Sequence, residues 1–301
     1  MKYTLKQLAV FESVATLGSV SNAADHLSLT QSATSMSLSQ LEKMLGRPLF
    51  ERQGKRMVLT QWGTWLRPKA KSLLFDAQQI ELGFYDQHVI SGEVRLGCSQ
   101  TAAEHLVPDL ISKIDTDFPE LRLAVKIKNT QKVIDGVLDY TYDMGIIEGR
   151  CDDSRIQQET WCNDHLVIVC SSSHPYAKLD NVSATQLMQA KWVLREDGAG
   201  TRKAFDYAIQ NLVDQLCVYR EYEHVPILRT LVAKGTYLSC LPYLDVIREV
   251  EAGTLSILPV SKLKIERRLI FIWRKDSGFN PLNECIRSEA KIMAREISKD
   301  M

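Results

Sequence analysis

Three polar clusters, far apart along the chain, each lie where an apolar stretch gives way to a helical pattern. They are Ser99-Gln100-Thr101, Asn129-Thr130-Gln131 and Gly198-Ala199-Gly200-Thr201-Arg202. Hydroxyl groups, unpaired backbone N–H groups and the positive end of a helix dipole all favour a small anion. The glycines let the backbone approach a ligand closely. The clusters therefore predict a small-anion site, with Thr101, Thr130 and Thr201 as its main contacts.

The charged residues near these clusters allow either a positive or a negative potential at the site. Arg195 and Arg202 could supply positive charge, but either could equally pair with Glu196 or lie in solvent. Glu148 would repel an anion unless it is protonated or paired. The alternative is that the Ser, Thr and Asn side chains are ordinary helix caps and the glycines ordinary turns. Three clusters at predicted strand ends, where ligands bind to open α/β sheets, favour ligand contact over capping alone.

A second set of residues, near the N-terminus, has the chemistry of a DNA-binding surface. The pattern predicts two short helices around a tight turn, with Thr30 as the N-cap of the second helix and Gly46 just past its end. The second helix has a buried stripe of Thr34, Leu38, Leu41 and Leu45. Its opposite face is small, polar and almost free of carboxylates, which suits base edges and phosphates. That face comprises Ser32, Ser35, Met36, Ser39 and Lys43.

A basic hairpin follows over residues 49–60, with Arg52, Lys55 and Arg56 at its tip. The arrangement predicts a winged helix-turn-helix that binds double-stranded operator DNA. The base-edge contacts would come from Gln31, Ser32 and Ser35, with Met36 and Ser39 on the same DNA-binding surface. The phosphate or minor-groove contacts would come from Arg52, Lys55 and Arg56. The alternative is an amphipathic helical hairpin with no nucleic-acid role.

Charge distribution favours the DNA-binding interpretation. Residues 1–71 hold ten Lys and Arg against four Asp and Glu, a net charge of +6. The whole chain has 37 of each kind, so residues 72–301 carry −6. A basic N-terminal module on an acidic body is the electrostatic pattern of a DNA-binding domain joined to another domain.

The residues between these two regions predict a long helix that pairs with a second copy of itself. Apolar residues alternate spacings of four and three, as in a coiled-coil seam: Leu66, Ala70, Leu73, Ala77, Ile80 and Phe84. The alternative is a helix packed on its own domain. We expect a winged helix-turn-helix over residues 1–60, a dimerisation helix over residues 61–90, and an effector domain over residues 91–301.

From residue 92 the pattern alternates strand and helix, which predicts an α/β domain with parallel sheets and flanking helices. The predicted elements include a helix over residues 102–117 and strands over residues 144–148, 166–170 and 269–273. We expect two lobes. Lobe I would comprise residues 91–162 and 268–301, and lobe II residues 163–267. The predicted anion site would lie in the cleft between them.

Composition limits the other possibilities. The longest apolar runs have strand length, and no signal peptide is recognisable, so we expect a cytoplasmic protein without a membrane association. The seven cysteines are an odd number with no C-x-x-C motif, which is typical of reduced, buried thiols. Cys162 and His165 alone have a metal-like spacing, and two ligands do not predict a metal site. We therefore expect neither metal nor cofactor.

The chain resembles the LysR-type transcriptional regulators over essentially its full length. The resemblance rests on Ala23-Ala24, Gln31-Ser32-Ala33, Leu41-Glu42, Leu49-Phe50 and Leu59-Thr60 in the head, and on Val107-Pro108, Phe118-Pro119, Asp143-Met144-Gly145-Ile146 and Leu238-Ser239-Cys240-Leu241-Pro242 in the body. It implies a two-lobed effector domain like the periplasmic binding proteins, a dimer through residues 66–84, and assembly into a tetramer. The segments Arg195–Arg202 and Ile146–Gly149 are most similar to the branch with CysB and the sulfite-responsive YeiE-like regulators. That branch implies a sulfur oxyanion or a short carboxylate as effector.

Three departures from the family pattern bear on function. Met36 stands where members often carry Arg, and Gln100 stands where the YeiE-like branch tends to have a small hydroxyl residue. The segment Leu194–Tyr207 lacks the redox cysteine of peroxide-sensing members. Two other classes fit the sequence less well. An enzyme on the two-lobed body would need a nucleophile–base constellation, and we find none. An architectural DNA binder would not need a second lobe. The interpretation is a ligand-responsive, DNA-binding regulator.

Overall fold

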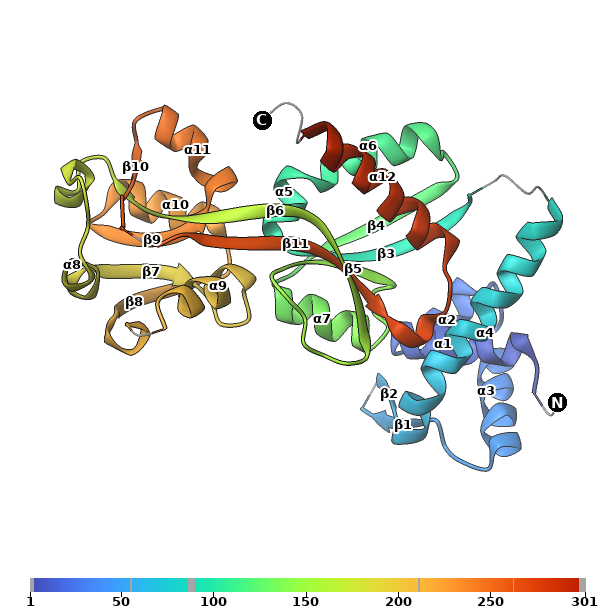
Figure 1. Cartoon of the computed structure of the whole chain (residues 1–301). Coiled ribbons are helices and arrows are strands. Elements are labelled where there is room, and N and C mark those ends of the chain that lie inside the picture. The colour runs from blue at the N-terminus through green and yellow to red at the C-terminus, as the bar shows by residue number, and fades with distance from the viewer. Residues whose placement is uncertain (1–2, 55, 86–89, 211, 262, 298–301) are drawn as a thin grey trace. The chain divides into compact units, whose positions relative to one another are not determined.

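Three short helices and a two-stranded hairpin open the chain and lead into a long helix (Figure 1). The computed structural model describes residues 3–54, 56–85, 90–210, 212–261 and 263–297. The chain divides into two compact units, which are described separately: residues 1–89 with 276–279, and the remainder. The elements of the first unit are α1 Leu5–Leu17, α2 Val20–His26, α3 Gln31–Leu45, β1 Phe50–Gln53, β2 Arg56–Leu59 and α4 Gln61–Tyr85.

Side-chain caps set where the first helices begin. The hydroxyl of Thr30 accepts a hydrogen bond from the backbone N–H of Ala33, and Gly46 ends α3 in the left-handed conformation, as predicted. The three helices pack around a core that includes Phe11, Leu41 and Leu49. The winged helix-turn-helix predicted from the sequence is therefore confirmed.

Glu42 and Gly63 fix the hairpin against the helices. The Glu42 carboxylate accepts hydrogen bonds from the backbone N–H groups of Leu49 at 2.7 Å and Phe50 at 3.2 Å. A Cβ on Gly63 would lie 2.2 Å from the Leu49 carbonyl oxygen, so only glycine allows α4 to start this close to β1. The single carboxylate of α3 is thus bound to the hairpin.

Helix α4 runs through Pro68 without a break. The predicted seam is divided between two environments. Leu66 and Ala70 are buried in the core of the DNA-binding unit, so the N-terminal part of this helix packs on its own domain, which was the alternative to a coiled-coil pairing. Leu73 and Ile80 are exposed by 44% and 63%. The side chain of Phe84 lies outside the described residues.

The second unit is a mixed α/β structure built on one long sheet, and its two ends are called lobe I and lobe II (Figure 1). Lobe I contains β3 Gly92–Cys98, α5 Gln100–His105, α6 Val107–Asp117, β4 Leu121–Ile127, α7 Thr130–Leu138, β5 Met144–Glu148 and α12 Pro281–Ile297. Lobe II contains α8 Ala184–Gln189, β7 Lys191–Arg195, α9 Gly200–Ala208, β8 Cys217–Tyr222, α10 Val225–Lys234, β9 Tyr237–Pro242, α11 Tyr243–Glu251 and β10 Leu255–Ile257. Short 3₁₀ helices lie at Pro175–Lys178, Val213–Gln215 and Lys275–Ser277.

Two long antiparallel strands, β6 Ile156–Ser171 and β11 Ile265–Arg274, pass through both lobes (Figure 1). The strand order is β4-β3-β5-β11-β6-β9-β7-β8, with β10 beside β6. The expected parallel pairing is found within each lobe, but the sheet as a whole is mixed. Strands β3, β4 and β5 pair in parallel, as do β7, β8 and β9, whereas β11 pairs antiparallel with β5 and β6. The predicted lobe boundaries at residues 162/163 and 267/268 fall inside these two strands.

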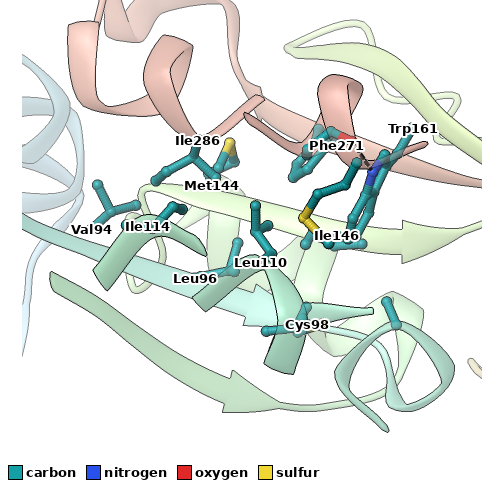
Figure 2. Packing of buried hydrophobic residues seen from close by; sticks show 14 of the residues in the cluster. Val94, Leu96, Cys98, Leu110, Ile114, Met144, Ile146, Trp161, Phe271 and Ile286 are labelled. Carbon is teal, nitrogen blue, oxygen red and sulfur yellow. Dashed lines mark hydrogen bonds between the residues drawn. The ribbon is translucent and has the colours of Figure 1, made fainter. Parts of the chain in front are cut away.

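Apolar side chains fill both faces of each half of the sheet. In lobe I, Leu96, Met144 and Phe271 face Leu110 and Ile286 from the covering helices (Figure 2). The register of β6 and β11 shifts between Leu269 and Ile270, which are paired with Cys162 and Thr160. The intervening Trp161 enters the same core and donates a hydrogen bond from its indole N–H to the Ala290 carbonyl at 2.8 Å (Figure 2). In lobe II, Trp192 and Phe205 pack with ring centroids 5.1 Å apart.

Within the described residues, no helix is long and apolar enough to span a bilayer.

Candidate DNA-binding surface and effector site

Helix α3 presents the predicted polar face to solvent. Gln31, Ser32, Ser35 and Ser39 are all exposed, whereas Thr34, Leu38 and Leu41 are buried. Met36 is 61% exposed and lies on the same face. A helix whose exposed side is small and uncharged can lie against base edges without steric or electrostatic conflict.

The hairpin tip carries exposed cations, as predicted. Arg52 and Arg56 are exposed, and the Arg52 Nε donates to the Gly54 carbonyl at 3.3 Å. Lys55 lies outside the residues that the structure describes. Exposed guanidinium groups of this kind are able to bind phosphate oxygens.

The three polar clusters of the sequence meet where lobe I and lobe II touch. Gly200, the first residue of α9 in lobe II, packs directly on the end of β5 in lobe I. A Cβ at this position would lie 2.6 Å from both the carbonyl oxygen and the Cβ of Glu148, and 2.7 Å from the Thr130 hydroxyl. The absence of a side chain at Gly200 therefore allows the two lobes to meet at this point.

A buried arginine, Arg267 of β11, lies at the centre of this junction. Its Nη1 donates to the Thr201 hydroxyl at 2.8 Å and to the Glu148 carboxylate at 2.7 Å. Its Nη2 donates to the Thr101 hydroxyl at 3.0 Å, and its Nε donates to the Asp164 carboxylate at 2.6 Å. The side chain is 2% exposed. One guanidinium thus joins hydroxyl groups and carboxylates from both lobes.

The Glu148 carboxylate occupies the position where an anion was predicted. Its Oε1 accepts from the backbone N–H of Thr101 at 3.3 Å, and its Oε2 accepts from the Thr201 hydroxyl at 3.3 Å. Burial alone would raise the pKa of Glu148, but the attraction of Arg267 and the bonds from Thr101 outweigh it and hold that pKa below its ordinary value. Glu148 is therefore ionised and paired. Helix α5 has six residues, so these direct bonds matter more than its dipole.

The two predicted arginines are bound elsewhere. Arg195 is 4% exposed and forms an ion pair with Glu196 at 2.9 Å. Arg202 pairs with Asp206 at 2.9 Å and Glu221 at 2.5 Å, and donates to the Arg195 carbonyl. The alternative of pairing with Glu196 therefore holds for Arg195, whereas Arg202 has different carboxylate partners.

The remaining predicted residues divide between capping and the lobe junction. Asn129 caps α7 by accepting from the N–H of Lys132, and its Nδ2 also donates to Glu196 of lobe II at 3.0 Å. Gln131 is exposed, but its backbone N–H donates to the Gly198 carbonyl at 3.0 Å. Gln100 donates to Glu104 at 2.6 Å.

Ser99 is different, because it begins α5 without a side-chain cap bond. Its buried hydroxyl oxygen has no hydrogen-bond partner among the described residues. A buried hydroxyl without a partner is uncommon and costs free energy. The Ser99 hydroxyl is therefore an unsatisfied polar group directly after β3, next to Gln100 and Thr101.

Sequence reasoning missed Arg267 and Asp164. A signal was nevertheless present, since β11 alternates buried and exposed residues and Arg267 falls in a buried position between Ile265 and Leu269. A charged residue at an inward position of an alternating strand requires a buried partner. The sequence pattern predicts a strand that begins only at residue 269, which leaves Arg267 outside it.

Comparison with known proteins decides the family. The family described as "LysR substrate binding domain" matches residues 87–291, and the lysR-family bacterial regulatory helix-turn-helix matches residues 5–64. The chain belongs to the LysR family of transcriptional regulators. It is 36% identical over 287 residues to an uncharacterised regulator of Escherichia coli, YeiE, covering 95% of this chain and 96% of that one. It is also 28% identical over 267 residues to the Bacillus subtilis regulator CysL, covering 88% and 89% of the two chains.

A solved structure supports the fold of this LysR-type regulator. A full-length OxyR variant from Pseudomonas aeruginosa matches with a TM-score of 0.77 and 19% identity, covering 96% of this chain and 98% of that one. Both relatives are named as transcriptional regulators. Because the chain matches both the DNA-binding and the substrate-binding models of this family, it is a DNA-binding transcriptional regulator with an effector domain.

Proposed function

We propose that this LysR-type regulator senses a small anion, a sulfur oxyanion or a short carboxylate, at the junction between its two effector lobes. The observation that carries the proposal is the environment of the Glu148 carboxylate. That anionic group of the chain itself accepts hydrogen bonds from the Thr101 N–H, the Thr201 hydroxyl and the Arg267 guanidinium. These are the donors that an external oxyanion needs.

In the arrangement seen here, an incoming anion competes with Glu148 for these donors. The donors come from α5, α9 and β11, and the side chains of Thr101, Thr201 and Arg267 are buried. Entry of a ligand therefore requires the lobes to separate around Gly200 and close again. The effect on DNA binding is limited by the difference in the ligand's affinity for the open and closed arrangements.

The DNA contacts that we propose are those of the exposed α3 face and the hairpin tip. Gln31, Ser32 and Ser35 would read base edges, with Met36 and Ser39 beside them, and Arg52 and Arg56 would bind phosphates or the minor groove. Dimerisation through α4 would set the spacing of two heads on operator DNA in the cytoplasm, and effector-domain contacts would extend the dimer to a tetramer.

The test of the proposed effector is calorimetric titration of full-length protein with sulfite, sulfate, thiosulfate and short carboxylates. Thr201→Val keeps the shape of the side chain and removes its hydroxyl, so we expect a loss of about 1.5–3 kcal/mol in binding a charged acceptor. Thr101→Val should weaken binding in the same direction. Thr230→Val is the matched control, because Thr230 is an exposed residue of α10 whose hydroxyl donates to the Pro226 carbonyl.

Two results would contradict the assignment. One is unchanged anion affinity in both Thr101→Val and Thr201→Val, and the other is an apolar molecule recovered from the lobe junction of the purified protein. Either would leave the DNA-binding function intact.

A further inference from the structure

A histidine and a carboxylate join the two lobes at a place separate from the Arg267 junction. His105 is the last residue of α5 in lobe I, and Asp245 lies in the first turn of α11 in lobe II. The His105 Nε2 and the Asp245 Oδ1 are 2.5 Å apart. Glu104 adds a second carboxylate, and one ligand atom from each of the three residues lies within 4.8 Å of the others.

Asp245 is an unusual carboxylate for a structural ion pair. The residue is 1% exposed, and its Oδ2 has no hydrogen-bond partner within the described chain. Burial raises the pKa of its carboxyl group, in spite of the hydrogen bond to His105. A buried carboxylate oxygen without a donor carries a desolvation cost that a cation would remove. His105 is partly exposed and Glu104 is exposed, so two of the three side chains are accessible to solvent.

We propose that Glu104, His105 and Asp245 form a binding site for a divalent transition-metal ion, with Zn²⁺ as the ion to test first. One imidazole nitrogen and two carboxylate oxygens are ligands that Zn²⁺ accepts, with water completing a tetrahedral site. Mg²⁺ and Ca²⁺ take oxygen ligands almost exclusively and are less suited to a site with imidazole.

Metal binding at this site replaces a proton. The hydrogen bond between His105 and Asp245 holds a proton on or between the two groups, whereas a metal ion needs neutral imidazole and ionised carboxylates. Binding therefore releases a proton and is weaker at low pH. Because α5 and α11 belong to different lobes, the ion would hold the lobes in the arrangement seen here. The site shares α5 with Thr101, and Glu104 accepts a hydrogen bond from Gln100 at 2.6 Å, but the site uses none of the hydrogen bonds that join Glu148, Thr101, Thr201 and Arg267.

The experiment is calorimetric titration of chelator-treated, full-length protein with Zn²⁺ in two buffers of different ionisation enthalpy. A Cys217→Ser background is used because Cys217 is an exposed thiol that could bind zinc by itself. We expect one ion per chain, with proton release. Removal of even an outer-shell partner of a metal typically costs about 10–100-fold in affinity, so His105→Gln and Asp245→Asn should each cost at least about tenfold.

Two further variants keep the test decisive. Glu104→Gln alters an exposed residue, so it tests the site even if Asp245→Asn does not fold, and it should also weaken binding. The control is Glu223→Gln with His224→Gln, an adjacent and exposed Glu-His pair on another helix end that should leave the titration unchanged. The proposal is overturned if the chelator-treated protein binds no Zn²⁺, or if Glu104→Gln and His105→Gln retain the parent affinity and stoichiometry.

Discussion

At the residue scale, the effector domain depends on one buried cation with two carboxylate partners. Arg267 bonds to Glu148 and Asp164, and the side chains of all three residues are at most 3% exposed. Removing one member of such a cluster leaves an unpaired charge in a low-dielectric interior, which costs more than the cluster itself contributes.

The first prediction follows from this cluster. Arg267→Met should lower the free energy of unfolding by about 3–5 kcal/mol, because Glu148 and Asp164 lose their shared partner. Arg268→Met, at the neighbouring exposed position of the same strand, should change it by no more than about 0.5 kcal/mol. Urea unfolding of the two variants measures the difference. Equal effects would show that the charge cluster does not stabilise the fold.

A second residue-scale prediction concerns pH. The hydrogen bond to Asp245 raises the pKa of His105 above its ordinary value of 6.5. The charges of Asp245 and Glu104 act in the same direction, while burial and Arg229 oppose them. A raised folded-state pKa means that the contribution of His105 to stability is fully present below pH 6.5 and is lost as pH rises through the folded pKa.

Urea unfolding in the presence of a chelator, as a function of pH, measures this contribution. The parent protein should lose stability relative to His105→Gln as pH rises above about 6.5. His224→Gln, at an exposed position, provides the control. Parallel curves for the parent and His105→Gln would contradict the prediction.

The residues of the candidate site show what sequence patterns can and cannot supply. Thr101, Thr130, Gly200 and Thr201 could be placed together because the carboxyl ends of parallel strands meet at one edge of a sheet. The position of Arg267 in the site could not be predicted, because its partners are at least 66 residues away in the sequence. The sequence of one strand does not indicate which carboxylates face it. The charge that balances Glu148 was therefore unknown until the fold was seen.

At the element scale, the longest strands were the hardest to predict. The prediction for strand β5 has the bounds that the structure shows, because its first four residues are apolar or small. All five residues are buried, including Glu148. Strand β6 was predicted only over residues 166–170. Its first ten residues include Gln157, Gln158 and Asn163. So many polar residues hide the alternation of apolar and polar positions by which a strand is recognised, so this part resembles a loop in the sequence. The helix predicted over residues 102–117 is two helices, with Pro108 in the first turn of the second.

The third prediction belongs to the hairpin. Arg56→Ala should weaken binding to all DNA sequences and reduce the slope of log affinity against log salt by about 0.9 for each phosphate that the hairpin no longer neutralises. Lys264→Ala, an exposed cation of the effector domain, should leave the slope unchanged. Fluorescence anisotropy of labelled operator DNA across a salt series measures the slope. If Arg56→Ala keeps the parent slope, the hairpin does not bind phosphates.

At the scale of the whole molecule, α4 is the element that we propose to join two chains. Its N-terminal apolar residues are used inside the DNA-binding unit, which leaves Leu73 and Ile80 exposed. Exposed apolar residues seven apart on one helix face suit a second helix with the same pattern.

The fourth prediction tests that assembly. Ile80→Glu should place a charge in the proposed interface and shift the protein towards smaller species, because burying an unpaired carboxylate there costs several kcal/mol. Ile80→Leu keeps an apolar side chain and should sediment as the parent does. Sedimentation velocity gives the assembly state. An unchanged sedimentation coefficient and operator affinity in Ile80→Glu would place the dimer interface elsewhere.

The two strands that pass through both lobes also constrain the order in which the protein can fold as it is synthesised. Strand β5, complete at Glu148, receives its partner β11 only when residues 265–274 have been made. The helix α12, which covers the core of lobe I, follows later still. Lobe I therefore remains an open sheet with an unpaired edge while about 120 further residues leave the ribosome, and such edges are prone to aggregation. Native lobe I is in this sense the last part of the chain to be completed, although most of its residues are made before those of lobe II.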